Sequence, residues 1–468
     1  MMILPLLLLL ACAPFANEAR ERVALTYEDG VATQRAHGAV RILLDGELLL
    51  AGGSGRATEQ GTRVTSDTPV RIASVTKLFT QLAVLRLVQA GTLDLDLPVG
   101  HYRPSLPAVL RDRVTLRQLL AMQSGLPREL TDDSATSGIE FDDEGRAGPF
   151  LDALTDLQLE SEPGSRTAYS NVGYWMVGAV LEAVGQDTWE AVVKREVLTP
   201  LGLEATRVDH GDGSAPDQAW GFVFDGDGVP QPVEPFHVSQ RYCSGSLLST
   251  ARDLATLGSA LLQPGFLEPR THAELFSRFG AADAEDRESL SALGHVPGFA
   301  NVLHVNAAHG LVLVVLNNAV GDDPMQSGSF ATGALVRAAL GDAAPPPRKE
   351  VWYYADKGLP DSAMGRAVGT WIELVRAGDR DALIARHEEF FLPGEFAQDG
   401  NSYAALADLF LSMRDHLGGG DFEVYCYRDE APPEFYLWLR GEGRELRLMF
   451  RPAPSMPTHI KDIAYPAF

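Results

Sequence analysis

The chain has little cysteine, an excess of acidic over basic residues and no long low-complexity tract, and each of these features excludes a class of protein. Its 468 residues include only 3 cysteines, too few for a disulfide framework, and no cysteine and histidine cluster has zinc-site spacing. Lysine and arginine number 39 against 63 aspartate and glutamate residues, a net charge of −24. Such a surface repels phosphate groups, so nucleic-acid binding is not expected. With 45% hydrophobic and 22% charged residues, the composition is that of a globular protein.

An apolar run long enough to cross a bilayer is also missing near the start of the chain. The run from Met2 to Ala11 is shorter than a membrane-spanning helix and is typical of the apolar part of a secretory signal. The segment Leu9-Leu10-Ala11-Cys12 has the form of a bacterial lipobox, in which Cys12 would carry the lipid; the alternative is an apolar peptide with an incidental cysteine. We expect residues 1–22 to be a signal peptide or lipoprotein signal, and the protein to be exported, either periplasmic or lipid-anchored in a bacterial envelope.

Two domains are predicted, because the chain is too long for one ordinary core. The segment 341–350, with three consecutive prolines, is the predicted linker. It separates a body of residues 23–340 from a C-terminal part of residues 351–468.

The body is predicted to be α/β, with strand pairs at both ends. Apolar runs at 38–43 and 47–52 flank Asp45-Gly46, a strong hairpin signal. Two further strands are expected at 299–305 and 311–317, so that the sheet joins both termini of the body. The helical patterns lie between these pairs, at 74–90, 115–122, 171–184 and 251–262. In the C-terminal part, helices at 363–377 and 403–417 precede three or four antiparallel strands, which predicts a small α+β domain.

Ser74 and Lys77 form the first candidate reactive pair. Residues at i and i+3 share a helix face, so the Lys77 ammonium can reach the Ser74 hydroxyl. A serine hydroxyl becomes a nucleophile when a neighbour takes its proton, and a lysine can do this when burial lowers its pKa. The alternative is a capping serine with a lysine that extends to solvent from the first turn.

Tyr169 and Asn171 form the second candidate pair, just before and at the start of the helix predicted at 171–184. A tyrosine near a cation can relay protons, and an asparagine amide can orient a substrate with both a donor and an acceptor. The alternative is Asn171 as the N-cap of that helix and Tyr169 as an ordinary packing residue.

In this order and with these neighbours, the two pairs give a resemblance to a known family. The chain resembles the serine β-lactamase and penicillin-binding-protein-like hydrolases over about residues 37–320. The matching segments are 67–77, 91–96, 119–127, 162–164, 169–171, 200–203 and 245–254. The resemblance implies a β-lactamase/DD-peptidase-like antiparallel sheet flanked by helices, with a helical lobe.

The resemblance also implies roles for the four residues. Ser74 would attack a carbonyl carbon and form an acyl-enzyme, and Lys77 would help to deprotonate it. Tyr169 would carry the proton to the leaving group, and Asn171 would position the substrate or Lys77. No metal or other cofactor is implied. The substrate would be a small molecule or peptide, that is, a β-lactam, a D-amino-acid peptide or an ester; the oligomeric state stays open. The alternative is a catalytically impaired penicillin- or peptide-binding sensor that retains the fold.

The third family motif departs from the pattern. Relatives carry Lys-Thr-Gly or His-x-Gly on the strand beside the serine, and the matching stretch here is 293–299. His295 is the candidate basic, substrate-binding residue, but the glycine expected two residues later is Pro297. Proline has no N–H, so Pro297 cannot supply the second donor of an oxyanion hole. Either another backbone N–H serves, or acyl transfer is impaired; alternatively, His295 is a loop histidine packed on the strand end.

Three further segments carry weaker expectations. The acidic stretch 128–161 is predicted to rim the cleft, the alternative being a solvated insertion. The run 225–228 suggests calcium, but a hairpin turn is the favoured interpretation. The C-terminal domain loosely resembles the nuclear-transport-factor-like fold, on residues 378–383 and 459–463.

Overall fold

The chain divides into two units, Met1–Val351 and Trp352–Phe468, in a computed structural model. The predicted linker 341–350 lies outside the described residues except for Gly341. The structure describes residues 4–33, 36–129, 145–152, 154, 157–209, 217–225, 228–233, 242–280, 288–320, 333–341, 355–357, 363–386, 403–421, 423–428, 435–441, 444–453 and 456–464.

The first unit is built on a five-stranded antiparallel sheet of order β2-β1-β10-β9-β8. Its strands are β1 (Gly38–Leu44), β2 (Glu47–Gly53), β8 (Ser289–Val296), β9 (Phe299–Asn306) and β10 (Leu311–Asn317). Strand β1 pairs with β10 in a register that runs from Gly38 opposite Asn317 to Leu44 opposite Leu311. The prediction that one sheet joins both ends of the body is therefore confirmed.

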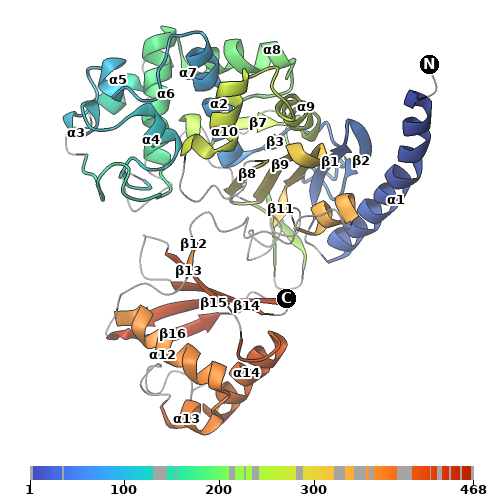
Figure 1. Ribbon diagram of the computed structural model, residues 1–468, viewed down its shortest axis with the longest axis vertical. Helices are drawn as coiled ribbons and strands as arrows, with labels where there is room; N and C mark the ends of the chain where they lie inside the picture. Colours follow the sequence, from blue (N-terminus) through green and yellow to red (C-terminus); the bar gives the residue numbers. More distant parts are fainter. Residues whose placement is uncertain are drawn as a thin grey trace. The chain divides into compact units, whose positions relative to one another are not determined.

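Helices cover both faces of this sheet, which explains why all seven residues of β10 are buried (Figure 1). Helix α9 (Ala251–Leu261) packs on one face so closely that a Cβ added to Gly258 would overlap Val312. On the other face, Leu313 and Val315 share a core with α1 (Leu4–Ala32) and with the helical residues 333–340. A strand buried on both sides has no polar face, so its sequence is almost all Leu and Val.

The C-terminal part of helix α1 packs against the sheet. Ala19 and Val23 are fully buried in the core under the sheet. Arg20 Nε donates to the carbonyl of Leu48 at 3.2 Å, and Arg22 Nε donates to that of Ala338 at 2.9 Å. The leader boundary after residue 22 stays a prediction. Among the helices that the structure describes, none combines the length and apolarity needed to cross a membrane.

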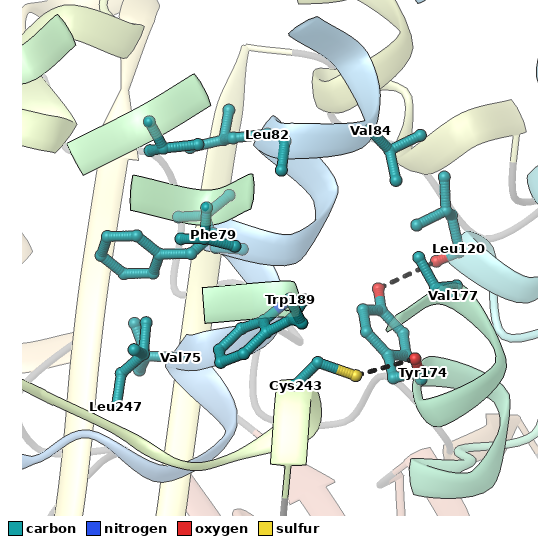
Figure 2. Close-up of a cluster of buried hydrophobic side chains, with 14 of the residues drawn as sticks. Val75, Phe79, Leu82, Val84, Leu120, Tyr174, Val177, Trp189, Cys243 and Leu247 are labelled. Carbon is teal, nitrogen blue, oxygen red and sulfur yellow. Dashed lines mark hydrogen bonds between the residues drawn. The ribbon is translucent and has the colours of Figure 1, made fainter. Parts of the chain in front are cut away.

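The remaining part of the first unit is a helical lobe centred on α2 (Thr76–Gln89) and α6 (Asn171–Gly185). Figure 2 shows part of its core, with Val75, Phe79 and Leu247 on one side of α2 and Leu120, Tyr174 and Val177 on the other. Because α2 is enclosed on nearly all sides, it is apolar almost all round. The other helices are α3 (Ala108–Arg111), α4 (Leu116–Leu120), α5 (Gly148–Asp152), α7 (Trp189–Val193), α8 (Thr199–Leu201) and α10 (Pro269–Phe276).

Two small sheets complete this unit. The first has the order β3-β7-β4 and the second the order β11-β5-β6. Their strands are β3 (Val70–Arg71), β4 (Arg207–Val208), β5 (Phe222–Phe224), β6 (Pro230–Pro232), β7 (Leu247–Ser249) and β11 (Ala319–Val320). The hairpin predicted around 225–228 agrees with the antiparallel pairing of β5 with β6, and Asp225 Oδ1 accepts a hydrogen bond from the Val229 N–H at 2.8 Å; Gly226 and Asp227 lie outside the described residues.

The second unit contains the helices and strands expected from its periodicity. A five-stranded antiparallel sheet has the order β12-β13-β14-β15-β16, and Trp371 packs edge-to-face on Phe410 at 4.8 Å between ring centroids. The elements are α12 (Ala363–Ala377), α13 (Arg380–Ala385), α14 (Tyr403–His416), β12 (Ala355–Lys357), β13 (Glu423–Arg428), β14 (Phe435–Gly441), β15 (Arg444–Ala453) and β16 (Met456–Ala464).

Candidate active site

Ser74 lies in a short 3-10 turn, Ala73–Val75, that leads directly into α2. The turn is anchored to β7, because the Ile72 N–H donates to the Leu247 carbonyl at 3.0 Å and the Leu247 N–H donates to Thr76 Oγ1 at 3.1 Å. Ala73 has a φ of 48°, a left-handed conformation that is costly for a residue with a Cβ. The neighbouring strands therefore hold Ser74 at a strained corner, half-buried and open to a ligand.

Lys77 is buried beneath Ser74 and donates three hydrogen bonds. Its Nζ lies 3.1 Å from Ser74 Oγ, 2.7 Å from Asn171 Oδ1 and 2.8 Å from the carbonyl oxygen of Ser244. Burial lowers the pKa of Lys77, and the nearby Tyr169, Cys243 and Glu129 partly oppose that shift. The alternative of a lysine extended into solvent is wrong, since Lys77 is only 5% exposed.

Tyr169 closes the network on the other side of the serine, with its hydroxyl 2.6 Å from Ser74 Oγ and its ring 4.7 Å from Lys77 Nζ. The N-cap of α6 is Ser170, whose Oγ accepts from the Gly173 N–H at 2.8 Å. The alternative of Asn171 as the cap is therefore wrong. Because Ser170 caps the helix, the Asn171 side chain is available to Lys77.

Gly294 of β8 is the residue that packs on the serine turn. A Cβ added there would overlap the carbonyl oxygen of Ile72 and lie 3.1 Å from the Ser74 backbone nitrogen. The sequence placed this glycine position at Pro297, after His295. That placement is wrong, because Pro297 and Gly298 form the two-residue turn of the β8–β9 hairpin. Gly298 has a φ of 80°, as the third residue of a type II turn requires.

The hairpin register sets the direction of the His295 backbone N–H. Val296 pairs with Phe299 across the two-residue turn, so these two residues exchange hydrogen bonds, and along β8 the bonded positions alternate. His295 therefore directs its N–H away from β9, and β8 is the terminal strand of its sheet. Gly294, the residue before His295, packs on the turn that holds Ser74.

The side chain of His295 lies elsewhere. Side chains alternate along a strand, so the imidazole projects from the face opposite to the one that Gly294 turns toward the serine, and it is exposed. The structure thus joins Ser74, Lys77, Tyr169 and Asn171 by hydrogen bonds, whereas the ring of His295 projects from the other face of β8.

Three participants were missed from the sequence: the Ser244 carbonyl, Gly294 and Glu129. Glu129 Oε1 accepts from Asn171 Nδ2 at 2.5 Å. Its position at the start of the acidic stretch predicted to rim the cleft was the available signal; residues 130–144 of that stretch lie outside the described residues. In the ranges that the structure describes, no group of three or more His, Cys, Asp or Glu residues could hold a metal ion.

Replacement of Gly294 by alanine is expected to disturb the serine turn. The new Cβ must displace the backbone of Ile72, so we expect a loss of about 1–3 kcal/mol in the free energy of unfolding, with a fall in any activity that depends on Ser74. Gly52→Ala on β2 is the matched control, because a Cβ there meets nothing within 4 Å. Thermal unfolding of both variants measures the difference; equal stability of Gly294→Ala and wild type would contradict the close packing.

Comparison with known proteins agrees with this geometry. A family model described as Beta-lactamase matches residues 23–336, about two thirds of the chain. The chain belongs to the β-lactamase family. Protein flp of Staphylococcus aureus is 24% identical over 322 residues, which cover 64% of this chain and 63% of that protein. This β-lactamase-family chain thus spans less than two thirds of the length of that relative.

Solved structures share the fold. The hydrolase EstCE1, described as having promiscuous acyltransferase activity, has a TM-score of 0.56 at 22% identity, over 70% of this chain and 99% of that one. A D-amino acid amidase from Ochrobactrum anthropi SV3 has a TM-score of 0.56 at 21% identity, over 69% and 99% of the two chains. At these identities the likeness establishes a mixed α/β fold with an antiparallel sheet flanked by helices.

Proposed function

We propose that this chain is a serine hydrolase that works through an acyl-enzyme on Ser74 and acts on amide or ester substrates. The observation that carries the proposal is the position of Ser74 Oγ, within hydrogen-bond distance of both Lys77 Nζ and Tyr169 Oη. A nucleophile with two proton-transfer partners can give up its proton on attack and receive help in protonating a leaving group.

The proposed reaction has two stages, acylation of Ser74 and hydrolysis of the acyl-enzyme. Neutral Lys77 takes the Ser74 proton while Oγ attacks the carbonyl carbon, and the oxyanion accepts hydrogen bonds from the N–H groups of Ser74 and His295. The intermediate collapses, and the leaving nitrogen or oxygen takes a proton through Tyr169, which is replenished from Lys77. Water then attacks the acyl-enzyme by the same path in reverse and releases the acid and free Ser74. Asn171 holds Lys77 throughout.

Within this class we propose esters and amides rather than β-lactams. The position two residues before the packing glycine, where relatives carry lysine or histidine, is occupied by Ala292. A neutral residue there provides no cation for a substrate carboxylate. The second candidate is a binding or sensor protein that is acylated without turnover, and it is motivated by the departure of the third family motif from its usual form.

A substrate panel with intact-mass detection distinguishes a hydrolase from a sensor protein. Aryl esters, D-amino-acid amides and a chromogenic cephalosporin are offered to the full chain. We expect multiple turnovers on an ester or amide, with the cephalosporin the poorest substrate. A persistent adduct with no turnover would favour the sensor, and the absence of both turnover and adduct would overturn the hydrolase proposal.

We also propose that the protein is exported and lipid-anchored through Cys12. Processing at Cys12 would keep Ala19, Arg20 and Arg22, which pack on the sheet, whereas cleavage after residue 22 would remove them. The intact mass of the mature protein tests this: a mass that begins beyond Ala19 would exclude it.

A further inference from the structure

Glu129 lies one hydrogen bond behind the network just described. Its Oε1 accepts from Asn171 Nδ2 at 2.5 Å, and Asn171 Oδ1 accepts from Lys77 Nζ at 2.7 Å. Asn171 is only 7% exposed, so its amide has little water with which to exchange partners. The amide therefore links a carboxylate to the buried lysine.

Only one orientation of the Asn171 amide satisfies both Glu129 and protonated Lys77. A carboxylate can only accept hydrogen bonds, and an ammonium can only donate them. Rotation of the Asn171 amide by half a turn would place its oxygen against Glu129 and its NH₂ against Lys77, which makes both contacts repulsive. Glu129 thus fixes which atom of Asn171 meets Lys77.

The orientation matters most when Lys77 is neutral. A neutral amine has two N–H groups and one lone pair, and two of the partners of Lys77, Asn171 Oδ1 and the Ser244 carbonyl, can only accept. Both N–H groups are then used, and the lone pair is left for the hydroxyl groups, Ser74 Oγ at 3.1 Å and the Tyr169 hydroxyl. With a freely rotating amide, Asn171 could instead donate to that lone pair and occupy the proton-accepting site.

We propose that Glu129 is a positioning residue that locks the Asn171 amide and so directs the proton-accepting lone pair of Lys77 at Ser74. This inference rests on the proposed function of Ser74 and Lys77. In it, Glu129 acts through Asn171 and contacts neither the substrate nor Ser74. The negative charge of Glu129 also raises the pKa of Lys77, as do Tyr169 and the Cys243 thiol. The ring of Tyr174 lies 5.4 Å from Lys77 Nζ, and the guanidinium of Arg128 lies 5.3 Å from the Tyr169 ring.

Two variants test the proposal in the full chain with the best ester or amide substrate. Glu129→Ala removes the acceptor, and we expect kcat to fall about tenfold to hundredfold, part of the 10²–10⁴ that general-base catalysis contributes, with little change in KM. Glu129→Gln keeps the shape, removes the charge and lets both amides rotate. We expect a smaller fall in kcat and a lower pKa of Lys77, so the acid limb of the pH–rate profile moves to lower pH.

A direct measurement of Lys77 makes the outcome independent of turnover. The chain has only five lysines, so ¹³C NMR of labelled lysine side chains can follow Lys77 alone in wild type and Glu129→Gln. Glu204→Gln, at an exposed carboxylate, is the control and should leave both the profile and the Lys77 pKa unchanged. A partial return of kcat in Glu129→Asp would support the positioning role.

The results that overturn the proposal are specific. Changes in KM alone, with kcat and the pH limb intact, would make Glu129 a substrate contact instead. An unchanged Lys77 pKa and unchanged kcat in both variants would exclude any role in positioning. If wild type shows no turnover and no adduct, the proposed function fails, and the Lys77 titration still decides whether Glu129 acts on the lysine.

Discussion

Ser74→Ala is expected to abolish covalent labelling by a fluorescent phosphonate and to lower kcat by about 10⁴- to 10⁶-fold, the range for loss of a serine nucleophile. The alanine methyl group has no lone pair and cannot attack a carbonyl carbon, and the oxygen that contacts Lys77 Nζ and Tyr169 Oη is lost. In-gel fluorescence and intact mass measure the label, and a substrate assay measures the rate.

Ser277→Ala is the matched control for this experiment. Ser277 follows α10, and its hydroxyl donates to the Glu274 carbonyl, so its loss should leave labelling and turnover at the wild-type level. Equal labelling of wild type and Ser74→Ala would show that another residue reacts, and the assignment of the nucleophile would be wrong.

Lys77→Met is expected to lower kcat/KM by about 10²- to 10⁴-fold, the usual contribution of a positioned general base. Methionine has nearly the length of lysine and fits a buried site, but it cannot accept a proton. The same change removes the pH dependence. Because Lys77 accepts a proton only when neutral, the wild-type rate should rise with pH and level off above its pKa. Burial lowers that pKa below the ordinary lysine value, so the limb falls at lower pH than a free lysine would give.

The pH–rate profiles of wild type and Lys77→Met measure this limb. Far-UV circular dichroism and thermal unfolding of the variant establish that the fold is retained, because the change also leaves Asn171 Oδ1 and the Ser244 carbonyl without their donor. A variant that keeps the wild-type limb would assign the titration to a different group, and a variant with full activity would remove Lys77 from the mechanism.

Local chemistry made part of this fold predictable. The alternation of side chains and the Asp45-Gly46 turn depend on neighbouring residues only, and both strands of that hairpin, β1 and β2, lie where they were expected. The spacing of Ser74 and Lys77 is likewise a property of one helical turn. The helix and strand periods of the C-terminal unit were visible for the same reason.

Helix α1 shows how a visible pattern leaves its packing partner open. Ala19, Val23 and Tyr27 recur every four residues and form one stripe, and the structure packs this stripe on the sheet. A stripe does not name its partner, however, and the preceding apolar run favoured a leader that extended to residue 22. The packing partner of the stripe is a face of the sheet formed by β1 (Gly38–Leu44), the next element in the chain, and by β10 (Leu311–Asn317), which is distant in the chain.

The register of the β8–β9 hairpin explains why the packing glycine was misplaced in the sequence prediction. Pro297 looked like a defect in an oxyanion hole because the motif was counted from His295. A two-residue turn at Pro297 and Gly298 shortens the hairpin, and the packing glycine is then Gly294. A shift by a single residue along a strand exchanges its two faces, so only the paired register could decide from which face of β8 the His295 ring projects.

By itself, the sequence determined the strands at both ends of the body, the Ser74–Lys77 pair and the residue types of the network, because these depend on contacts within a few residues. The tertiary structure alone decided that Lys77 is buried, that Ser244 and Glu129 lie beside its network, and that Gly294 of β8 packs on the Ser74 turn. The reason is physical: desolvation, the orientation of an amide and the direction of an edge N–H all depend on segments that are distant in the chain and meet only when it folds.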